Sequence, residues 1–395
     1  MIQPETKKVK LNDTELIDKI SDLPDCIILH ILSLLNTKDA VQTCILSVRW
    51  KDLWKRLPAL IFRRSGFSTK SRFTKFVSKV LSLHDSSSAL QYVDFDNDGC
   101  LGPHLIEMVV NYAISHNVQQ LGLCVNCNIA QIPLALFSSQ TLTHLRLSIY
   151  YQDIDIAQFS LNLPALTHLK LILSLYPSGD EILFPKSFNL PSLTNLHLED
   201  FAFCPGENGR AEPFSVFKRL NSLLLYGFAL RDTLTLCISS ATLVNLTTKN
   251  YSDDYSEIEL LTPNLVTFAF YGRPCQKVFG SDLSNVKHVD IDVPVFLLDI
   301  KPFLLLSWLL NFDNIKSLTV STSALQALSY DSNLLKIKHA SFGNLKSLKV
   351  KKKPCVYWLK RKLLEAKLVN KEPDGIVDFL IQNSPSAEVE IIDCS

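Results

Sequence analysis

The sequence has little glycine and no strong net charge of either sign. Its 395 residues include only 12 glycines, and 40 basic and 39 acidic residues leave a formal net charge of +1. So few glycines disfavour folds that depend on many tight phosphate-binding loops. A net charge close to zero argues against an interface for polyanions spread over the whole surface, so we expect no nucleic-acid partner.

The sequence also lacks a long uninterrupted apolar run. The most hydrophobic window, residues 293–310, contains Pro294, Asp299, Lys301 and Pro302, so it cannot cross a bilayer as one helix. The first ten residues lack the apolar core of a secretory signal. The 10 cysteines are irregularly spaced, which favours reduced thiols over a disulfide framework. We therefore expect no membrane association and a soluble protein of the cytoplasm, the nucleus or both.

Catalytic and cofactor motifs are absent as well, including the GxSxG, HExxH, phosphate-loop and kinase signatures. Two short patterns imitate metal sites. Residues 94–99 place acids like the first half of a calcium loop, but the twelfth position is Leu105, which cannot ligate. Cys124 and Cys127 have zinc-type spacing without a second ligand pair at a suitable distance. We predict no enzymatic activity, no cofactor and no metal site.

A dense helical segment occupies residues 20–54. Apolar residues recur at helical spacing after Pro24, and Asn36 can close this first helix. Thr37 predicts the start of a second helix, and Ser47 the start of a third that carries Trp50 and Trp54. Three short helices bury little by themselves, so several of their apolar side chains should remain available for another surface.

Downstream of this segment, a six-residue pattern recurs: apolar-x-x-apolar-x-apolar. Eleven copies start 21 to 30 residues apart, at Leu90, Val118, Leu142, Leu166, Leu193, Leu220, Leu243, Leu265, Val286, Ile315 and Leu345. This is the period of leucine-rich repeats, in which each repeat contributes one strand with alternate side chains buried. We predict an α/β solenoid with a curved parallel sheet on its concave face and helices and loops on its convex face. It should be irregular, because Phe201 and Phe228 stand where an asparagine is usual.

The patterns divide the chain into four parts. Residues 1–18 are predicted to be a flexible tail, 19–62 the helical segment, 63–353 the repeats with a leading helix at 73–81, and 354–395 a C-terminal cap. Further helices are predicted at residues 104–115, 357–369 and 375–382, the last of them before a strand at 389–391. Residues 177–179 and 205–209 are predicted to be loops.

Residues 23–54 resemble the plant F-box, in the pattern LPDxIxxxILSxLxTKDAVxTxxLSxRWxxLW. Residues 376–392 resemble the start of the FBD region that ends many plant F-box/leucine-rich-repeat proteins. The resemblance implies a substrate-recognition subunit of a cullin-based (SCF-type) ubiquitin ligase. Its F-box would bind a Skp-type adaptor, and through it a cullin, while the repeats bind an unknown target protein. The implied adaptor surface includes Leu23, Pro24, Ile31, Leu32 and Leu35.

Within the repeats, the residues between the buried leucines should face the concave side, which is usually the binding side. The predicted target-binding residues are His144, Arg146, His168, Lys170, His197, Glu199, Tyr226 and Tyr271. Polar residues are expected on this face in any case because it meets water. Two alternatives stay open: an interaction scaffold without a degradation role, and a receptor that holds a small molecule between repeats and target. The second needs long inserts over the concave face, which the repeat spacing does not provide.

Histidines on three successive predicted strands, His144, His168 and His197, suggest that partner binding depends on mildly acidic pH. We expect the partner affinity to differ between about pH 6 and about pH 7.5. An affinity that is the same at both values would remove the hypothesis.

Overall fold

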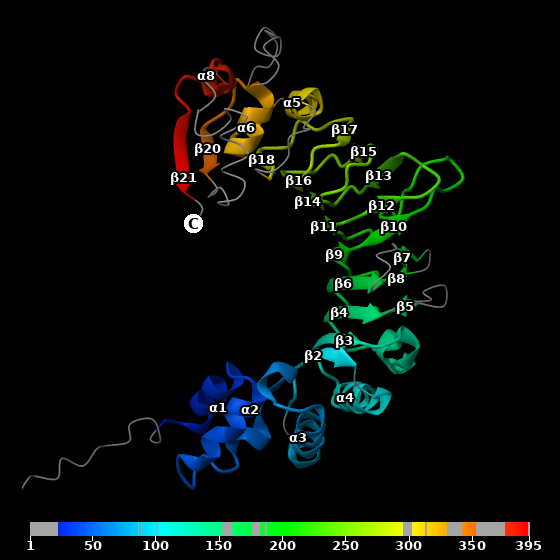
Figure 1. Ribbon diagram of the computed structural model, residues 1–395, viewed down its shortest axis with the longest axis vertical. Coiled ribbons are helices and arrows are strands. Elements are labelled where there is room, and N and C mark those ends of the chain that lie inside the picture. Colours follow the sequence, from blue (N-terminus) through cyan, green and yellow to red (C-terminus); the bar gives the residue numbers. More distant parts are fainter. Residues whose placement is uncertain are drawn as a thin grey trace, which may run out of the picture.

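The computed structural model describes residues 23–85, 87, 89–100, 102–151, 160–175, 182–185, 188–294, 302–312, 314–329, 342–352 and 376–393. The predicted tail, the loop at 177–179 and the helix at 357–369 lie outside these residues. Within them, thirteen strands form one sheet of parallel strand pairs. The strands follow one another from the helices α1 and α2 to β21 (Figure 1). The chain thus has the predicted α/β architecture of helices followed by a repeat sheet.

The helical segment contains two α-helices and two 3-10 helices: α1 Asp25–Ser33, α2 Thr37–Gln42, η1 Thr43–Ile45 and η2 Leu53–Arg56. Asn36 does not close α1 as predicted, because its side chain accepts a hydrogen bond from the Asp39 amide and so caps α2. The third helix predicted from Ser47 is not an α-helix; turns lead from η1 into η2. Leu46 and Val48 are 64% and 90% exposed, so no packing holds a longer helix in place.

The helical segment is continuous with the repeat sheet. Trp54 and Leu57 are buried between the two parts of the chain that they connect in sequence. β1 (Ala59–Arg63) then pairs with β2 as the first strand of the main sheet, so the boundary predicted after residue 62 runs through a strand. The Ile61 amide donates a hydrogen bond of 2.7 Å to the Thr37 hydroxyl at the start of α2. No linker therefore separates the two parts.

Each predicted hexad begins two residues before one strand of the main sheet and runs into it. The strands are β2 Tyr92–Cys100, β3 Gln120–Asn126, β4 His144–Tyr151, β6 His168–Leu175, β9 Asn195–Glu199, β11 Ser222–Tyr226, β14 Asn245–Asn250, β16 Thr267–Gly272, β18 His288–Asp292, β19 Ser317–Ser321 and β20 Ser347–Lys352. Equivalent hexad positions pair with one another, as Leu145 does with Leu169 and Leu169 with Leu196. A slip of one residue would turn the buried leucines toward water, so burial fixes this register.

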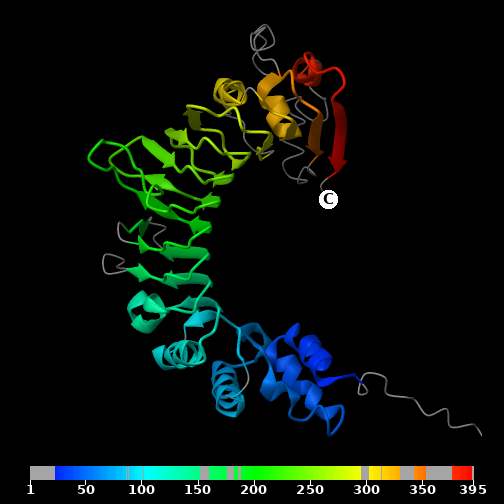
Figure 2. The same ribbon diagram turned by 180° about the vertical axis from the view of Figure 1, so that it is seen from behind.

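One face of the main sheet is covered by the segments that lead the chain from the end of each strand to the start of the next (Figure 2). The helices predicted at residues 73–81 and 104–115 are confirmed as α3 Lys70–Leu83 and α4 Pro103–Ser115. Phe201 and Phe228 are buried on this side, as predicted. The remaining elements are η3 Arg64–Gly66, η4 Ile129–Gln131, η5 Leu134–Ser138, α5 Pro302–Asn311, α6 Thr322–Ser329, β5 Leu161–Asn162, β7 Ile182–Leu183, β8 Phe188–Asn189, β10 Phe201–Phe203, β12 Ala229–Leu230, β13 Thr235–Ser239, β15 Ser256–Leu261 and β17 Gln276–Gly280.

The C-terminal part ends the sheet. The helix and strand predicted there are α8 Ile376–Ile381 and β21 Glu388–Asp393, and β21 pairs with β20. Across the described ranges, no helix combines the length and apolar character needed to cross a membrane.

His84 joins the helical segment to the first repeats. It follows α3, is 6% exposed, and places Nε2 2.9 Å from the Leu57 carbonyl oxygen and Nδ1 2.9 Å from the Tyr112 hydroxyl of α4. A carbonyl only accepts, so Nε2 carries the proton and Nδ1 accepts from Tyr112. The neutral ring satisfies both partners, and burial lowers the pKa of His84.

We expect acid to destabilise this joint. Because the pKa of His84 is lower in the folded chain than its ordinary 6.5, the unfolded chain takes up the proton first. The free energy of unfolding should therefore fall as the pH drops below about 6.5. Replacing His84 by Ala at neutral pH should cost about 3 kcal/mol, from two lost hydrogen bonds and a cavity.

Urea denaturation at neutral and mildly acidic pH measures both effects. A His84→Gln variant should lose part of the acid-induced destabilisation, whereas the exposed His30→Gln should keep all of it. An unchanged pH profile in His84→Gln would contradict this role.

Candidate functional site

The helical segment carries an exposed apolar surface, which we call the apolar patch. Its members are large apolar side chains that are each more than a third exposed: Ile27, Ile31, Leu34, Leu35, Ile45, Leu46 and Val48. A segment this short cannot enclose all of its apolar side chains in a core of its own, so some remain exposed to solvent. Such a cluster on a short segment is typical of an interaction surface.

The patch contains part of the predicted adaptor surface. Ile31 and Leu35 are 38% and 37% exposed, Pro24 is exposed, and Leu23 is half-buried against the core. Leu32 corrects the prediction: it is fully buried, since helical spacing places it on the inner side of α1 with Ile28. Sequence reasoning missed Ile27, Leu34, Ile45, Leu46 and Val48, although their density in one short segment was a signal.

The second surface is the face of the main sheet that turns away from the return segments, which we call the open face. The predicted target-binding residues all lie on it and none is buried. Two come from each of the strands β4, β6 and β9, while β11 and β16 contribute Tyr226 and Tyr271.

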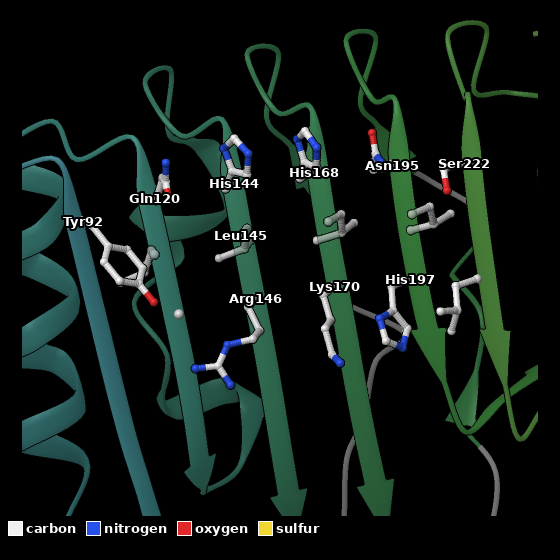
Figure 3. Close-up of a pocket in the computed structure, with 15 residues that line it drawn as sticks. Tyr92, Gln120, His144, Leu145, Arg146, His168, Lys170, Asn195, His197 and Ser222 are labelled. Atoms are coloured by element: carbon white, nitrogen blue, oxygen red, sulfur yellow. The ribbon is translucent and has the colours of Figure 1, made fainter. Parts of the chain in front are cut away.

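A cleft of about 410 Å³ lies on the open face, across β2 to β11 (Figure 3). Its polar lining is Tyr92, Gln120, His144, Arg146, His168, Lys170, Asn195, His197 and Ser222. It thus brings five of the eight predicted residues together. Glu199, Tyr226 and Tyr271 do not line it: Tyr226 packs against Tyr251, and Tyr271 donates a hydrogen bond to Asp290.

Asp94 and two arginines form an ion-pair network at one end of the cleft. The Asp94 side chain on β2 is 4% exposed. It accepts hydrogen bonds from Arg63 on β1 at 2.6 Å and from Arg146 on β4 at 2.5 Å. Burial alone would raise the pKa of Asp94, but hydrogen bonds from Arg63 and Tyr92 and the charge of Arg146 lower it below its ordinary value. The negative charge of Asp94 therefore compensates the positive charges of the two arginines. Among the described residues, no group of three metal-ligating side chains occurs.

Gly122 makes this network possible. It lies on β3, between the strands of Asp94 and Arg146. A Cβ atom there would stand 2.5 Å from Asp94 Oδ1 and 3.0 Å from Arg146 Nη2. The carboxylate and the guanidinium meet above β3 only because this position has no side chain.

Lys170, His197 and Glu199 form a second charged group. Glu199 Oε1 lies 3.2 Å from Lys170 Nζ and 2.7 Å from His197 Nε2. Burial and then the charge of Lys170 lower the pKa of His197, although Glu199 opposes them. Burial and the neighbouring His168 also lower the pKa of His144. These histidines therefore resist protonation in the unliganded protein, and pH-dependent binding stays a prediction.

Comparison with known proteins gives the helical segment a family. Residues 20–62 match the model of the F-box domain. The segment that carries the apolar patch is therefore an F-box domain.

Most of the chain is similar to F-box proteins of Arabidopsis thaliana. An FBD-associated F-box protein is 27% identical over 288 residues, which cover 71% of this chain and 60% of that protein. An F-box/FBD/LRR-repeat protein is 24% identical, with 87% of this chain and 74% of the relative covered. An F-box/LRR-repeat protein is 25% identical, with 95% and 91% covered. The chain thus spans less than two thirds of the first of these relatives.

Replacing Gly122 by Ala tests the ion-pair network. In an unobstructed site this change stabilises a protein by about 0.4–1 kcal/mol, through the entropy of the unfolded chain. Here the new methyl group collides with Asp94 and Arg146, so we expect about 1–3 kcal/mol of destabilisation instead.

Urea denaturation measures the sign, with Gly102→Ala as control, because a Cβ at Gly102 has no atom within 4 Å. Equal stability of the two variants would contradict the role of Gly122.

Proposed function

We propose that the chain is the substrate-recognition subunit of a cullin-based (SCF-type) ubiquitin ligase. The observation that carries the proposal is the joining of an F-box domain with an uncovered apolar patch to a long polar sheet face. One surface would bind the Skp-type adaptor and the other a target protein. The names of the Arabidopsis relatives, which combine F-box and LRR, support the same division of roles.

The apolar patch is the proposed adaptor surface. Leu34, Ile45, Leu46 and Val48 are between 64% and 90% exposed, which is costly in water unless a partner covers them. After η1, Leu46 and Val48 stay exposed, while Arg49 donates to the Leu23 carbonyl oxygen and to Asp25, and Trp50 and Trp54 are buried. We infer that contact with the adaptor orders this stretch further and completes the third helix of the domain.

The open face is the proposed target surface. We infer that it is the concave side of a curved solenoid; the F-box helices and the C-terminal strands extend to the same side of the sheet in Figure 1, which supports this. The chain would contribute no bond chemistry. It would raise the effective concentration of a target lysine near a ubiquitin-conjugating enzyme.

An interaction scaffold without a degradation role remains the alternative. Both proposals place a partner on the open face, and only the ligase role needs the apolar patch. If the ligase role is right, variants of the patch should lengthen the cellular lifetime of a bound partner while they leave its binding unchanged.

We expect charged residues in the patch to prevent adaptor binding. Leu34→Asp combined with Val48→Asp should reduce co-purification of a Skp-type adaptor at least about tenfold, because two carboxylates would be buried unpaired. The fold should be unaffected, since these side chains are 72% and 90% exposed. Co-purification from plant extract, with the adaptor quantified by mass spectrometry, measures the effect.

The matched control is Leu134→Asp, which changes an 81% exposed leucine in the repeats. It should bind the adaptor like the unaltered chain. Equal recovery by all three proteins, or recovery by none, would rule the proposed role out.

A further inference from the structure

We propose that the cleft on the open face binds a carboxylate side chain from an acidic segment of the target, held by Arg146 and Lys170 together with the neighbouring imidazoles of His144 and His168, which take up a proton as it binds. The inference deepens the proposed function, on which it rests for the identity of the occupant as a target protein. It adds the chemical class of the segment that is recognised, and a proton that accompanies its binding.

Charge complementarity is the first argument. Among the described residues, no carboxylate lines the cleft, whereas Arg146, Lys170 and three imidazoles do. The carboxylates that balance these cations lie deeper: the Asp94 side chain is 4% exposed and Glu199 is 17% exposed, against 35% for both Arg146 and Lys170. A ligand that approaches the open face therefore meets the positive groups first.

The hydrogen bonds behind the two histidines decide what the rings offer to the cleft. The Thr143 hydroxyl lies 2.9 Å from His144 Nδ1 and 3.0 Å from the Gln119 carbonyl oxygen. A carbonyl oxygen only accepts, so the Thr143 hydroxyl donates its proton to Gln119 and its oxygen accepts from His144 Nδ1. The ring proton of neutral His144 therefore sits on Nδ1, and Nε2 is the atom that can take up a further proton.

The next repeat has the same arrangement. The Thr167 hydroxyl donates to the Thr143 carbonyl oxygen at 3.0 Å and lies 2.9 Å from His168 Nδ1, from which its oxygen accepts. The sequence LTHL, present in both repeats, thus builds the same arrangement twice. Within the part of the chain that the structure describes, neither Nε2 atom forms a hydrogen bond to protein, so both can take up a proton that a ligand brings with it.

The two rings stand parallel, with centroids 4.1 Å apart and planes 9° from each other. The two Nε2 atoms therefore lie on neighbouring strands, and a ring that takes up a proton there gains an N–H donor for a carboxylate oxygen. Asn195 and Gln120 flank the pair on β9 and β3, and Tyr92 stands beyond Gln120 on β2 (Figure 3). These neighbours are neutral.

Binding of an acidic group should take up a proton. Without a ligand, burial and then the stacked His168 lower the pKa of His144. A carboxylate against Nε2 of His144 favours the charged imidazolium, so it raises this pKa. The affinity should therefore increase as the pH falls, which gives the predicted pH sensitivity a direction and a cause.

A labelled peptide of six glutamates tests the proposal on the full chain, by fluorescence anisotropy at low ionic strength. We expect saturable binding that strengthens roughly threefold between about pH 7.5 and 6, from protonation of one histidine. A peptide of six glutamines should not bind. Equal binding of both peptides, or a flat pH profile for hexaglutamate, would overturn the proposal.

Two variants separate the cleft from general attraction to lysines. Lys170→Met should weaken hexaglutamate binding about tenfold. Lys349→Met removes a similar lysine of the same face, paired with Glu390 at 2.9 Å on the far strands, and should leave binding unchanged. The double variant His144→Gln/His168→Gln removes both titrating rings, so it should lose the pH dependence of binding. Equal effects of the two lysine variants would contradict the assignment.

Free anions are tested in the same assay. If inorganic phosphate displaces the labelled peptide at concentrations where unlabelled hexaglutamate does not, the occupant is a small anion and the protein assignment is overturned. Peptide binding does not involve the apolar patch, so failure of this inference leaves adaptor binding intact. Conversely, a chain that binds the peptide but no adaptor would reject only the proposed ligase role.

Discussion

The shared register of the buried leucines is the constraint on which the rest of the structure depends. Each hexad buries alternate side chains, and each strand pairs with the next at equivalent positions, so every repeat places its exposed residues in the same rows. His144 therefore lies beside His168, and Arg146 beside Lys170, although each pair is 24 residues apart in sequence. A functional surface follows from the same burial that holds the fold together.

Much of this architecture could be predicted from the sequence because its signals are local and repeated. The hexads predicted the eleven strands of the main sheet from β2 to β20, and helical spacing predicted α3 and α4. Signals that depend on a single residue failed more often. Asn36 is an equally good end for one helix and start for the next. After Ser47, Val48 is exposed although Trp50 and Trp54 pack into the core, so the apolar spacing there does not produce an α-helix.

The site was predictable as a row of residues but not as a cleft. The alternation of the hexad placed His144, Arg146, His168 and Lys170 on one face. It could not reveal the network of Asp94, because Arg63 and Arg146 reach this carboxylate from different strands, and the contact depends on side-chain length and on the absence of a Cβ at Gly122. The inward position of Leu32 likewise depends on which side of a short helix meets the core.

The two surfaces differ in chemistry as their proposed partners require. The apolar patch gains from the exclusion of water, whereas the open face offers donors and cations above buried carboxylates. Hydrogen exchange of the full chain, with and without a Skp-type adaptor, tests the central claim most directly. The account predicts that the adaptor slows amide exchange in residues 25–48 and leaves β4, β6 and β9 unchanged. Unchanged exchange in residues 25–48, or protection confined to the open face, would contradict it.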